Sequence, residues 1–276
     1  MGEVAAASDP DALWTLLWPM LMATPRVMAA VTVAPLFPAS LFPGLLRNTL
    51  AVSLALCLYP HIAAHMPGPE LTAAAWIALI GKEIFLGMLI GLAVGTLVWV
   101  LESAGSIIDL QIGWSNNMIF DPFGGHESAI MASFMSRLAV ALFVVGGGLY
   151  VFVTLLYESY QLWPLASFHP VIDGRLLDFS TGALGSIAQS IVRVAAPVVL
   201  LLVLIDLGFG LINRVVPQLN VFFFTMPLKA AAAALMIAIY LSYLADIVVA
   251  EMSDLRQFLE RVAPVLQPPG PISHGR

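Results

Sequence analysis

The chain has 276 residues, of which 60% are hydrophobic and only 10% are charged. Soluble domains carry about 25% charged residues, so this composition excludes an ordinary water-soluble globule and indicates an integral membrane protein or a subunit of a membrane complex. The formal net charge of −6 argues against nucleic acid as a partner, because nucleic-acid binding needs clustered Lys and Arg.

Apolar runs follow one another along the chain, and we expect an all-α fold in which these runs form helices. A helix needs about 20 apolar residues to cross a bilayer, and most of the runs exceed that length. The runs cover residues 13–37, 45–62, 74–101, 129–157, 184–212 and 221–249. The acidic N-terminus lacks the basic region of a cleaved signal peptide, so we expect the first run to stay in the mature protein.

These runs predict a single helical domain over residues 1–250. Residues 251–276 follow it, and their first part (EMSDLRQFLERV) has apolar residues at the spacing of a short amphipathic helix. The Pro/Gly-rich end, QPPGPISHGR, is expected to be disordered.

Several runs are longer than a bilayer requires, so the helices either tilt or break. Breaks are expected at Gly146-Gly147-Gly148, at Pro197 and at Pro227, because glycine triplets weaken helices and proline removes a hydrogen bond. Ordinary kinked spans are the alternative.

No group of residues indicates catalysis, and we expect no enzyme activity, cofactor or metal. His61 and His65 have the i, i+4 spacing of helical metal ligands, but no third ligand accompanies them. The chain has one cysteine, Cys57, which lies in an apolar run and is expected to be a small core residue.

Charged residues interrupt the apolar runs, and each costs about 3 kcal/mol at the centre of a bilayer. Lipid-facing placement of all of them is therefore not expected, and we assign them to buried positions at seams between subunits or to a wet pathway. They are Lys82, Glu83, Arg137, Arg193, Asp206, Lys229 and Asp246.

The third run contains Gly87, Gly91 and Gly95, which fall on one helix face. A row of small residues at this spacing allows close approach of another helix. The sequence therefore predicts a helix-packing face here.

The segment GSIIDLQIGWSNNMIFDPFGGHES, residues 105–128, mixes large apolar side chains with polar ones. Neither a solvated loop nor an ordinary span has this composition. Irregular backbone at membrane depth is tolerated where it is packed in protein or lines a cavity. We expect a re-entrant structural loop or a pore-lining element.

This segment, with KEIFLGMLIG before it and PQLNVFFFTMPLK after it, resembles the SctT/FliR family of export-gate proteins of bacterial type III secretion. The resemblance covers nearly the whole chain, and the NVFFFTMPLK version looks more like the virulence (injectisome) branch than the flagellar one. It implies a non-enzymatic helical subunit of the export gate in the bacterial inner membrane, which helps to form and close the channel for unfolded proteins.

The implied partners are SctR-like and SctS-like gate subunits, an SctU-like switch protein, inner rod or needle components, and unfolded secreted proteins as cargo. The resemblance also implies that the loop after the third run plugs the closed channel. The corresponding residues are Ser106, Asp109, Gln111, Asn116, Asn117, Met118, Ile119, Phe120, Asp121 and Pro122. Flagellar relatives place phenylalanines in this loop, whereas this chain has Asn116, Asn117 and Met118 before Phe120, so the sealing side chains are not assigned.

The aromatic segment near residue 222 is interpreted as an apolar packing surface or gasket, with a turn of the chain at its proline and a partner for Lys229 at a subunit seam. Its residues are Phe222, Phe223, Phe224, Met226 and Pro227. The alternatives to an injectisome subunit are a flagellar export-gate homologue and a secondary transporter or proton channel, which the intramembrane charges would also suit.

Overall fold

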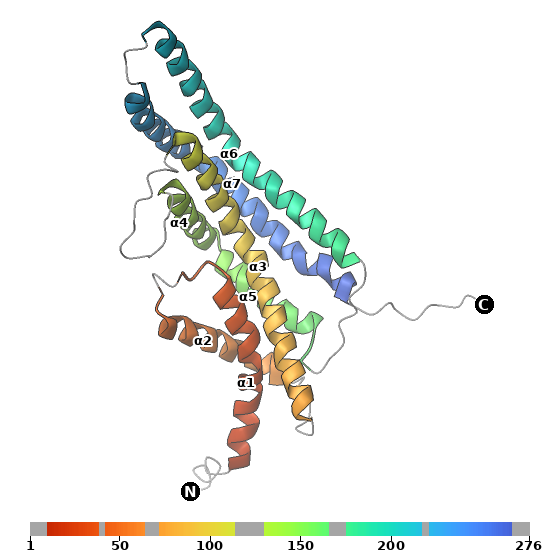
Figure 1. Ribbon diagram of the computed structural model, residues 1–276. Coiled ribbons are helices and arrows are strands. Elements are labelled where there is room, and N and C mark those ends of the chain that lie inside the picture. The colour runs from red at the N-terminus through yellow and green to blue at the C-terminus, as the bar shows by residue number, and fades with distance from the viewer. Residues whose placement is uncertain are drawn as a thin grey trace, which may run out of the picture. The chain divides into compact units, whose positions relative to one another are not determined.

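The computed structural model describes residues 10–38, 42–63, 72–113, 130–165, 175–216 and 221–266, with the backbone alone at 10–20, 60–63, 175–184, 221–222 and 256–266. The helices in this part are coloured along the chain in Figure 1. They are α1 (Pro10–Val33), α2 (Gly44–Ala63), α3 (Ala73–Ile112), α4 (Ile130–Val145), α5 (Gly148–Leu162), α6 (Arg175–Val215) and α7 (Val221–Leu266).

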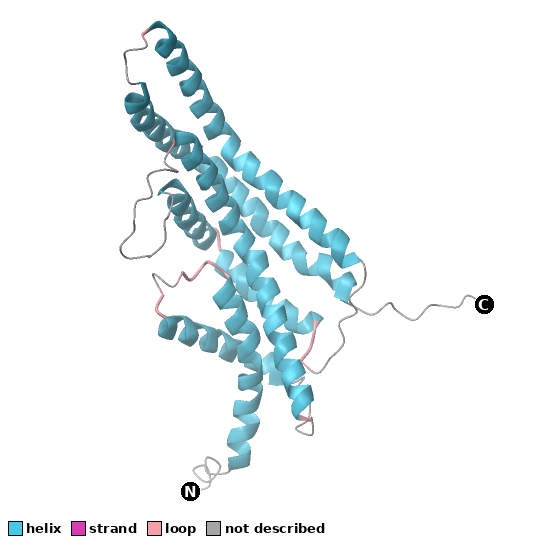
Figure 2. Cartoon of the chain, viewed as in Figure 1, coloured by secondary structure: helices cyan, strands magenta, loops and turns pink. Residues whose placement is uncertain are grey.

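The described residues contain helices and no strand (Figure 2), so the all-α prediction is confirmed. Three helical segments are long and apolar enough to cross a membrane: Ala73–Ile112, Gly185–Val215 and Phe223–Leu255. The pair α4 and α5 would count as a fourth, broken span.

The chain folds as two compact units. The first unit comprises Met1–Gly95, Leu149–Leu176 and Asp254–Arg276, and so contains α1, α2, the first part of α3 and nearly all of α5. The second unit comprises Thr96–Gly148 and Leu177–Ser253, and contains the rest of α3, α4 and most of α6 and α7.

In the first unit, α1 packs closely on α3 at glycines. A Cβ atom added at Gly87 would collide with the carbonyl oxygen of Arg26 and lie 2.8 Å from the Cβ of Ala29. At Gly91 it would lie 2.8 Å from the carbonyl oxygen of Ala30. The backbones can approach this closely only because both positions lack a side chain.

In the second unit, α6 and α7 run side by side in opposite directions (Figure 1). Their buried residues recur every four positions, as Val194, Val198 and Leu202 on α6 and as Ala233 and Ile237 on α7. This spacing places each set on one helix face.

The break at the glycine triplet is confirmed. Gly147 has a φ of +82°, which a residue with a side chain rarely adopts, and it separates α4 from α5. The next residue, Gly148, lies against the ring of Phe143, where a Cβ would be 2.5 Å from ring carbons.

The breaks predicted at the two prolines are wrong, because α6 runs through Pro197 and α7 runs through Pro227. Pro197 has no N–H to donate to the carbonyl of Arg193, four residues earlier. That carbonyl instead accepts a hydrogen bond of 3.4 Å from the Tyr240 hydroxyl on α7. A donor from the neighbouring helix thus partners the carbonyl that the proline leaves without its intrahelical donor.

Two further boundaries differ from the predictions. The third helix continues to Ile112, so residues 105–112 are helical and not part of an irregular loop. The amphipathic segment that begins at residue 251 is helical but continuous with α7, which ends at Leu266. The tail beyond 266 lies outside the described residues. Cys57 is exposed, so its assignment to the core is wrong.

Candidate functional site

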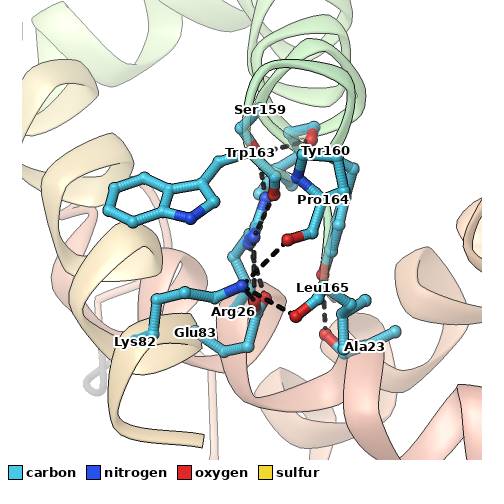
Figure 3. Close-up of polar contacts among 10 residues, drawn as sticks. Ala23, Arg26, Lys82, Glu83, Ser159, Tyr160, Trp163, Pro164 and Leu165 are labelled. Atoms are coloured by element: carbon cyan, nitrogen blue, oxygen red, sulfur yellow. Dashed lines mark hydrogen bonds and ion pairs between the residues drawn. The ribbon is translucent and has the colours of Figure 1, made fainter. Parts of the chain in front are cut away.

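A charged network occupies the interior of the first unit (Figure 3). Arg26 on α1 and Glu83 on α3 are both fully buried. The Arg26 guanidinium donates from Nε to Glu83 Oε2 at 2.7 Å and from Nη2 to Oε1 at 2.9 Å. Such a bidentate pair fixes the relative orientation of the two side chains as well as their distance.

The other Arg26 donors reach α5 and the residues just after it. Nη1 donates to the Ser159 hydroxyl at 3.1 Å, and Nη2 also donates to the Trp163 carbonyl at 3.1 Å. The guanidinium lies 3.9 Å from the centroid of the Tyr160 ring, and the Tyr160 hydroxyl donates to the Ala23 carbonyl at 2.9 Å. Arg26 therefore joins α1, α3 and α5 through hydrogen bonds and one cation–π contact.

Lys82 extends the network on its other side. Its Nζ lies 3.1 Å from Glu83 Oε1 and donates to the carbonyls of Pro164 and Leu165 at 3.0 and 3.1 Å. An ammonium group has three donors, and these contacts use all of them. The polar atoms of the network are thus engaged with one another, which suits a structural lock that specifies one packing of the helices.

A second polar site lies in the second unit, where α3 ends and α4 begins. The buried Asp109 carboxylate on α3 accepts hydrogen bonds from the backbone N–H groups of Met131 and Ala132, at 3.1 and 2.9 Å. These groups belong to the first turn of α4, which has no intrahelical acceptors for them. Asp109 therefore ties the start of α4 to α3.

Two residues further along α3, Gln111 contacts α6 and α7. The Gln111 side-chain amide donates to Asp206 on α6 at 3.0 Å, and Lys229 on α7 donates to the Gln111 carbonyl. Lys229 also forms an ion pair with Asp206 at 2.9 Å. We call Asp109, Gln111, Asp206 and Lys229 the α3-end cluster.

Of the residues expected to form the plug, Ser106, Asp109 and Gln111 lie on helix α3. The Ser106 hydroxyl donates to the Glu102 carbonyl within that helix. The remaining predicted residues lie outside the described residues: Asn116, Asn117, Met118, Ile119, Phe120, Asp121 and Pro122. The assignment of this segment to a plug stays a prediction.

The aromatic segment belongs to the first turns of α7. Phe223 and Phe224 are exposed, with their rings in an edge-to-face contact, and Phe222 is described by its backbone alone. Met226 is half-buried, and its methyl group is next to Gly113. Pro227 is exposed and lies within the helix, so the expected turn of the chain at this proline is wrong.

The predicted seam charges divide into two groups. Lys82 and Glu83, and likewise Asp206 and Lys229, have ion-pair partners within their own unit. The others, Arg137, Arg193 and Asp246, are exposed and have no ion pair within the described part of the chain. Gly95 is buried on the same helix as Gly87 and Gly91.

Sequence analysis missed Arg26, although the signal was present. Arg26 interrupts the first apolar run just as Arg137 interrupts the fourth, and the same rule would have selected it. Gly105 was also missed: a Cβ there would lie 2.7 Å from the Cα of Ala132, so α3 and α4 touch at that level. No metal-binding group of His, Cys, Asp or Glu occurs among the described residues; His65 lies outside them.

Comparison with known proteins gives the family. The model of the family "Bacterial export proteins, family 1" matches residues 17–255, which include both polar sites. The chain belongs to this family. Among characterised proteins, the chain is similar to the Yop proteins translocation protein T of Yersinia pestis, with 36% identity over 217 residues, 78% of this chain and 83% of that protein.

Two further characterised proteins are similar to the chain over a comparable extent. The surface presentation of antigens protein SpaR of Salmonella typhimurium is 31% identical, over 79% of this chain and 80% of its own. The flagellar biosynthetic protein FliR of Pectobacterium carotovorum is 27% identical, over 81% of this chain and 83% of its own. The resemblance to the SctT/FliR family is thus confirmed, and the chain is a protein-export family member. Its long apolar helices are those of a membrane protein.

Proposed function

We propose that this protein is a non-enzymatic subunit of a type III secretion export gate, and that it helps to form and close the channel through which unfolded proteins are exported. The family match over residues 17–255 supports export as the process. The main support for a role as a subunit is the large exposed apolar surface of α6 and α7.

These two helices are apolar, yet little of them is covered by the rest of the chain. In the most apolar stretch of α6 only 17% of the residues are buried, against 61% for α3. Large apolar side chains such as Leu204, Leu211 and Ile239 are more than half exposed. Apolar surface on this scale needs lipid or partner subunits to cover it.

The exposed charges favour partner subunits over lipid for part of this surface. Arg137, Arg193 and Asp246 lie on apolar helices without an ion pair in the described residues. A charge facing hydrocarbon at mid-membrane costs about 3 kcal/mol on insertion scales. SctR-like and SctS-like subunits, with an SctU-like switch protein and inner rod components nearby, are the proposed neighbours.

The segment between α3 and α4 is proposed to plug the closed channel. The base of this segment is held by the α3-end cluster, which fixes the last turn of α3 and the first turn of α4. Phe223 and Phe224, exposed on α7, are proposed to pack against a partner subunit.

The injectisome branch is favoured over the flagellar one. The relatives named for Yop translocation and for surface presentation of antigens are 36% and 31% identical to this chain, whereas the flagellar relative quoted above is 27% identical. These identities support our proposal that the protein belongs to the inner-membrane base of a virulence secretion system.

Co-purification tests the proposal. The tagged chain would be expressed in mild detergent with and without its candidate SctR-like and SctS-like partners, and the particle mass measured by native mass spectrometry. We expect one large complex that contains a single copy of this chain. A stable monomer or homodimer that ignores these partners would contradict the proposal and would direct attention to transport of small solutes or protons.

A further inference from the structure

The two helix ends that face each other across residues 113–130 lack charges of the sign that stabilises a helix end. The last turn of α3 contains no basic residue, and the first turn of α4 contains no acidic residue. Helix ends favour the opposite arrangement, with anions at the N-terminus and cations at the C-terminus, because the peptide dipoles align. In this protein both charges come from other helices.

Asp109 supplies the anion for α4. Its two carboxylate oxygens accept from the N–H groups of Met131 and Ala132, the second and third residues of α4. A side chain just before a helix normally accepts from these positions, but the residue before α4 is Ala129, whose side chain has no acceptor. Asp109 replaces the missing cap from across the helix contact at Gly105.

Lys229 supplies the cation for α3. The N–H of Gly113, a residue with a φ of +97°, donates to the carbonyls of Asp109 and Leu110. The next carbonyl in the last turn, that of Gln111, receives the Lys229 ammonium group. At the end of α3, the carbonyls that lack an intrahelical partner therefore accept either from the N–H of the left-handed Gly113 or from Lys229 of α7.

We infer that Asp109 and Lys229 are positioning residues: two charges of opposite sign, supplied by neighbouring helices, cap the end of α3 and the start of α4 and thereby fix the separation and register of these helix ends. Asp206 holds Lys229 in place through the ion pair. The inference concerns contacts within the second unit and does not depend on the proposed export function.

The Asp109 cap can be tested by a distance measurement between α3 and α4. Spin labels would be placed at Leu110→Cys and Phe134→Cys, both exposed positions, in a Cys57→Ser background of the full chain, alone or in its co-purified complex. Asp109→Asn removes the charge and one acceptor, so we expect the distance distribution by pulsed electron paramagnetic resonance to broaden and shift. Asp254→Asn, the same change at another exposed carboxylate, is the matched control and should leave it narrow.

Circular dichroism separates loss of the cap from loss of the fold. If Asp109→Asn keeps its helix content, a broadened distribution supports the cap and an unchanged distribution overturns it. If Asp109→Asn does not fold, Asp109→Glu replaces it in the test. This change keeps the charge but lengthens the side chain beside the close contact at Gly105. We then expect the distance between the labels on α3 and α4 to shift, and an unchanged distance would contradict the inference.

The Lys229 cap can be separated from its ion pair by exchanging the two charges. Asp206→Lys combined with Lys229→Asp restores an ion pair but places a carboxylate next to the Gln111 carbonyl. With a second label on α7 at Leu235→Cys instead of Phe134→Cys, we expect this double variant to resemble Lys229→Ala, with a broadened α3–α7 distance. A return to the wild-type distribution would show that the ion pair alone matters and would overturn the role of Lys229 as a cap.

Discussion

Arg26 and Glu83 are separated by 57 residues in sequence and meet through two hydrogen bonds of 2.7 and 2.9 Å, with both side chains fully buried. Ion pairs in such surroundings contribute specificity more than stability, because desolvation offsets much of the attraction. Removing Arg26 is costly, since the buried Glu83 carboxylate then loses its bidentate partner and keeps only its contact with the Lys82 ammonium group. This asymmetry gives a direct test of the network.

Arg26→Met should lower the free energy of unfolding by about 3–5 kcal/mol, because Glu83 loses its bidentate partner in the interior. Thermal unfolding in detergent, followed by circular dichroism, would measure the change. The double variant Arg26→Met/Glu83→Leu should recover part of the loss, because the buried carboxylate is removed as well, while Lys82 keeps its hydrogen bonds to the Pro164 and Leu165 carbonyls. A double variant no more stable than the single one would show that the hydrogen bonds to α5, and not the stranded carboxylate, dominate.

Gly87→Ala should destabilise the first unit by about 1–3 kcal/mol, because the new Cβ would collide with the Arg26 carbonyl oxygen and force α1 and α3 apart. Gly81→Ala is the matched control on the same helix, where a Cβ meets nothing within 4 Å. That control should be neutral or stabilising by up to about 1 kcal/mol, because alanine favours helix over glycine. Equal effects of the two substitutions, measured by thermal unfolding, would argue against close packing at Gly87.

Gly147→Ala should cost about 1–2 kcal/mol, because a residue with a side chain is strained at a φ of +82°. The added Cβ itself meets no atom within 4 Å, so the conformation and not a clash is responsible. Gly208→Ala on α6 also adds a Cβ in open space but within a helix, and should not destabilise. If both variants unfold at the wild-type temperature, α4 and α5 are not joined through a left-handed residue.

Assembly should protect Arg193 and Asp246, if these exposed charges face partner subunits as proposed. Single cysteines at these positions, in a Cys57→Ser background, would be labelled with a membrane-impermeant maleimide before and after co-expression with the partners. We expect labelling to fall in the complex. Val145, which is 86% exposed at the end of α4, provides a comparison position, also changed to cysteine. Undiminished labelling at 193 and 246 would place these charges in water or headgroups.

Much of the fold could be predicted because membrane helices are encoded locally. A long apolar run satisfies its own backbone hydrogen bonds only as a helix, so runs such as 74–101 specify helices before any tertiary contact is known. The triplet at Gly146-Gly147-Gly148 likewise predicted its break, since glycine alone adopts the observed φ without strain.

The prediction was wrong where a distant side chain changes the local outcome. Asp109 and Gln111 made residues 105–112 look like a loop, yet the Asp109 carboxylate is satisfied by α4 and the Gln111 side chain by Asp206 on α6, and the helix continues to Ile112. Pro197 similarly predicted a break, but α6 continues through it and the carbonyl that it leaves open accepts from the Tyr240 hydroxyl. In each case the decisive partner is more than twenty residues away, beyond the reach of any local pattern.

The candidate site was predicted in part. The rule that charges inside apolar runs need partners selected Lys82, Glu83, Asp206 and Lys229, and each has a partner in the structure. The same rule cannot say whether that partner lies in the same chain or in another one. The pairing of Asp206 with Lys229 depends on the antiparallel packing of α6 and α7, which the sequence does not specify.

The contacts of Lys82 with Pro164 and Leu165 have a consequence for biosynthesis. A ribosome that has just added Glu83 has already produced Arg26 and Lys82, but the Pro164 carbonyl that Lys82 binds lies 82 residues further along the chain than Lys82, and the groups on and just after α5 that Arg26 binds are equally absent. Until then these three side chains, two cations and one carboxylate, lack the hydrogen bonds that α5 and the residues just after it supply. Entry of these helices into lipid one at a time is therefore disfavoured, and their burial is expected to wait for the translation of α5.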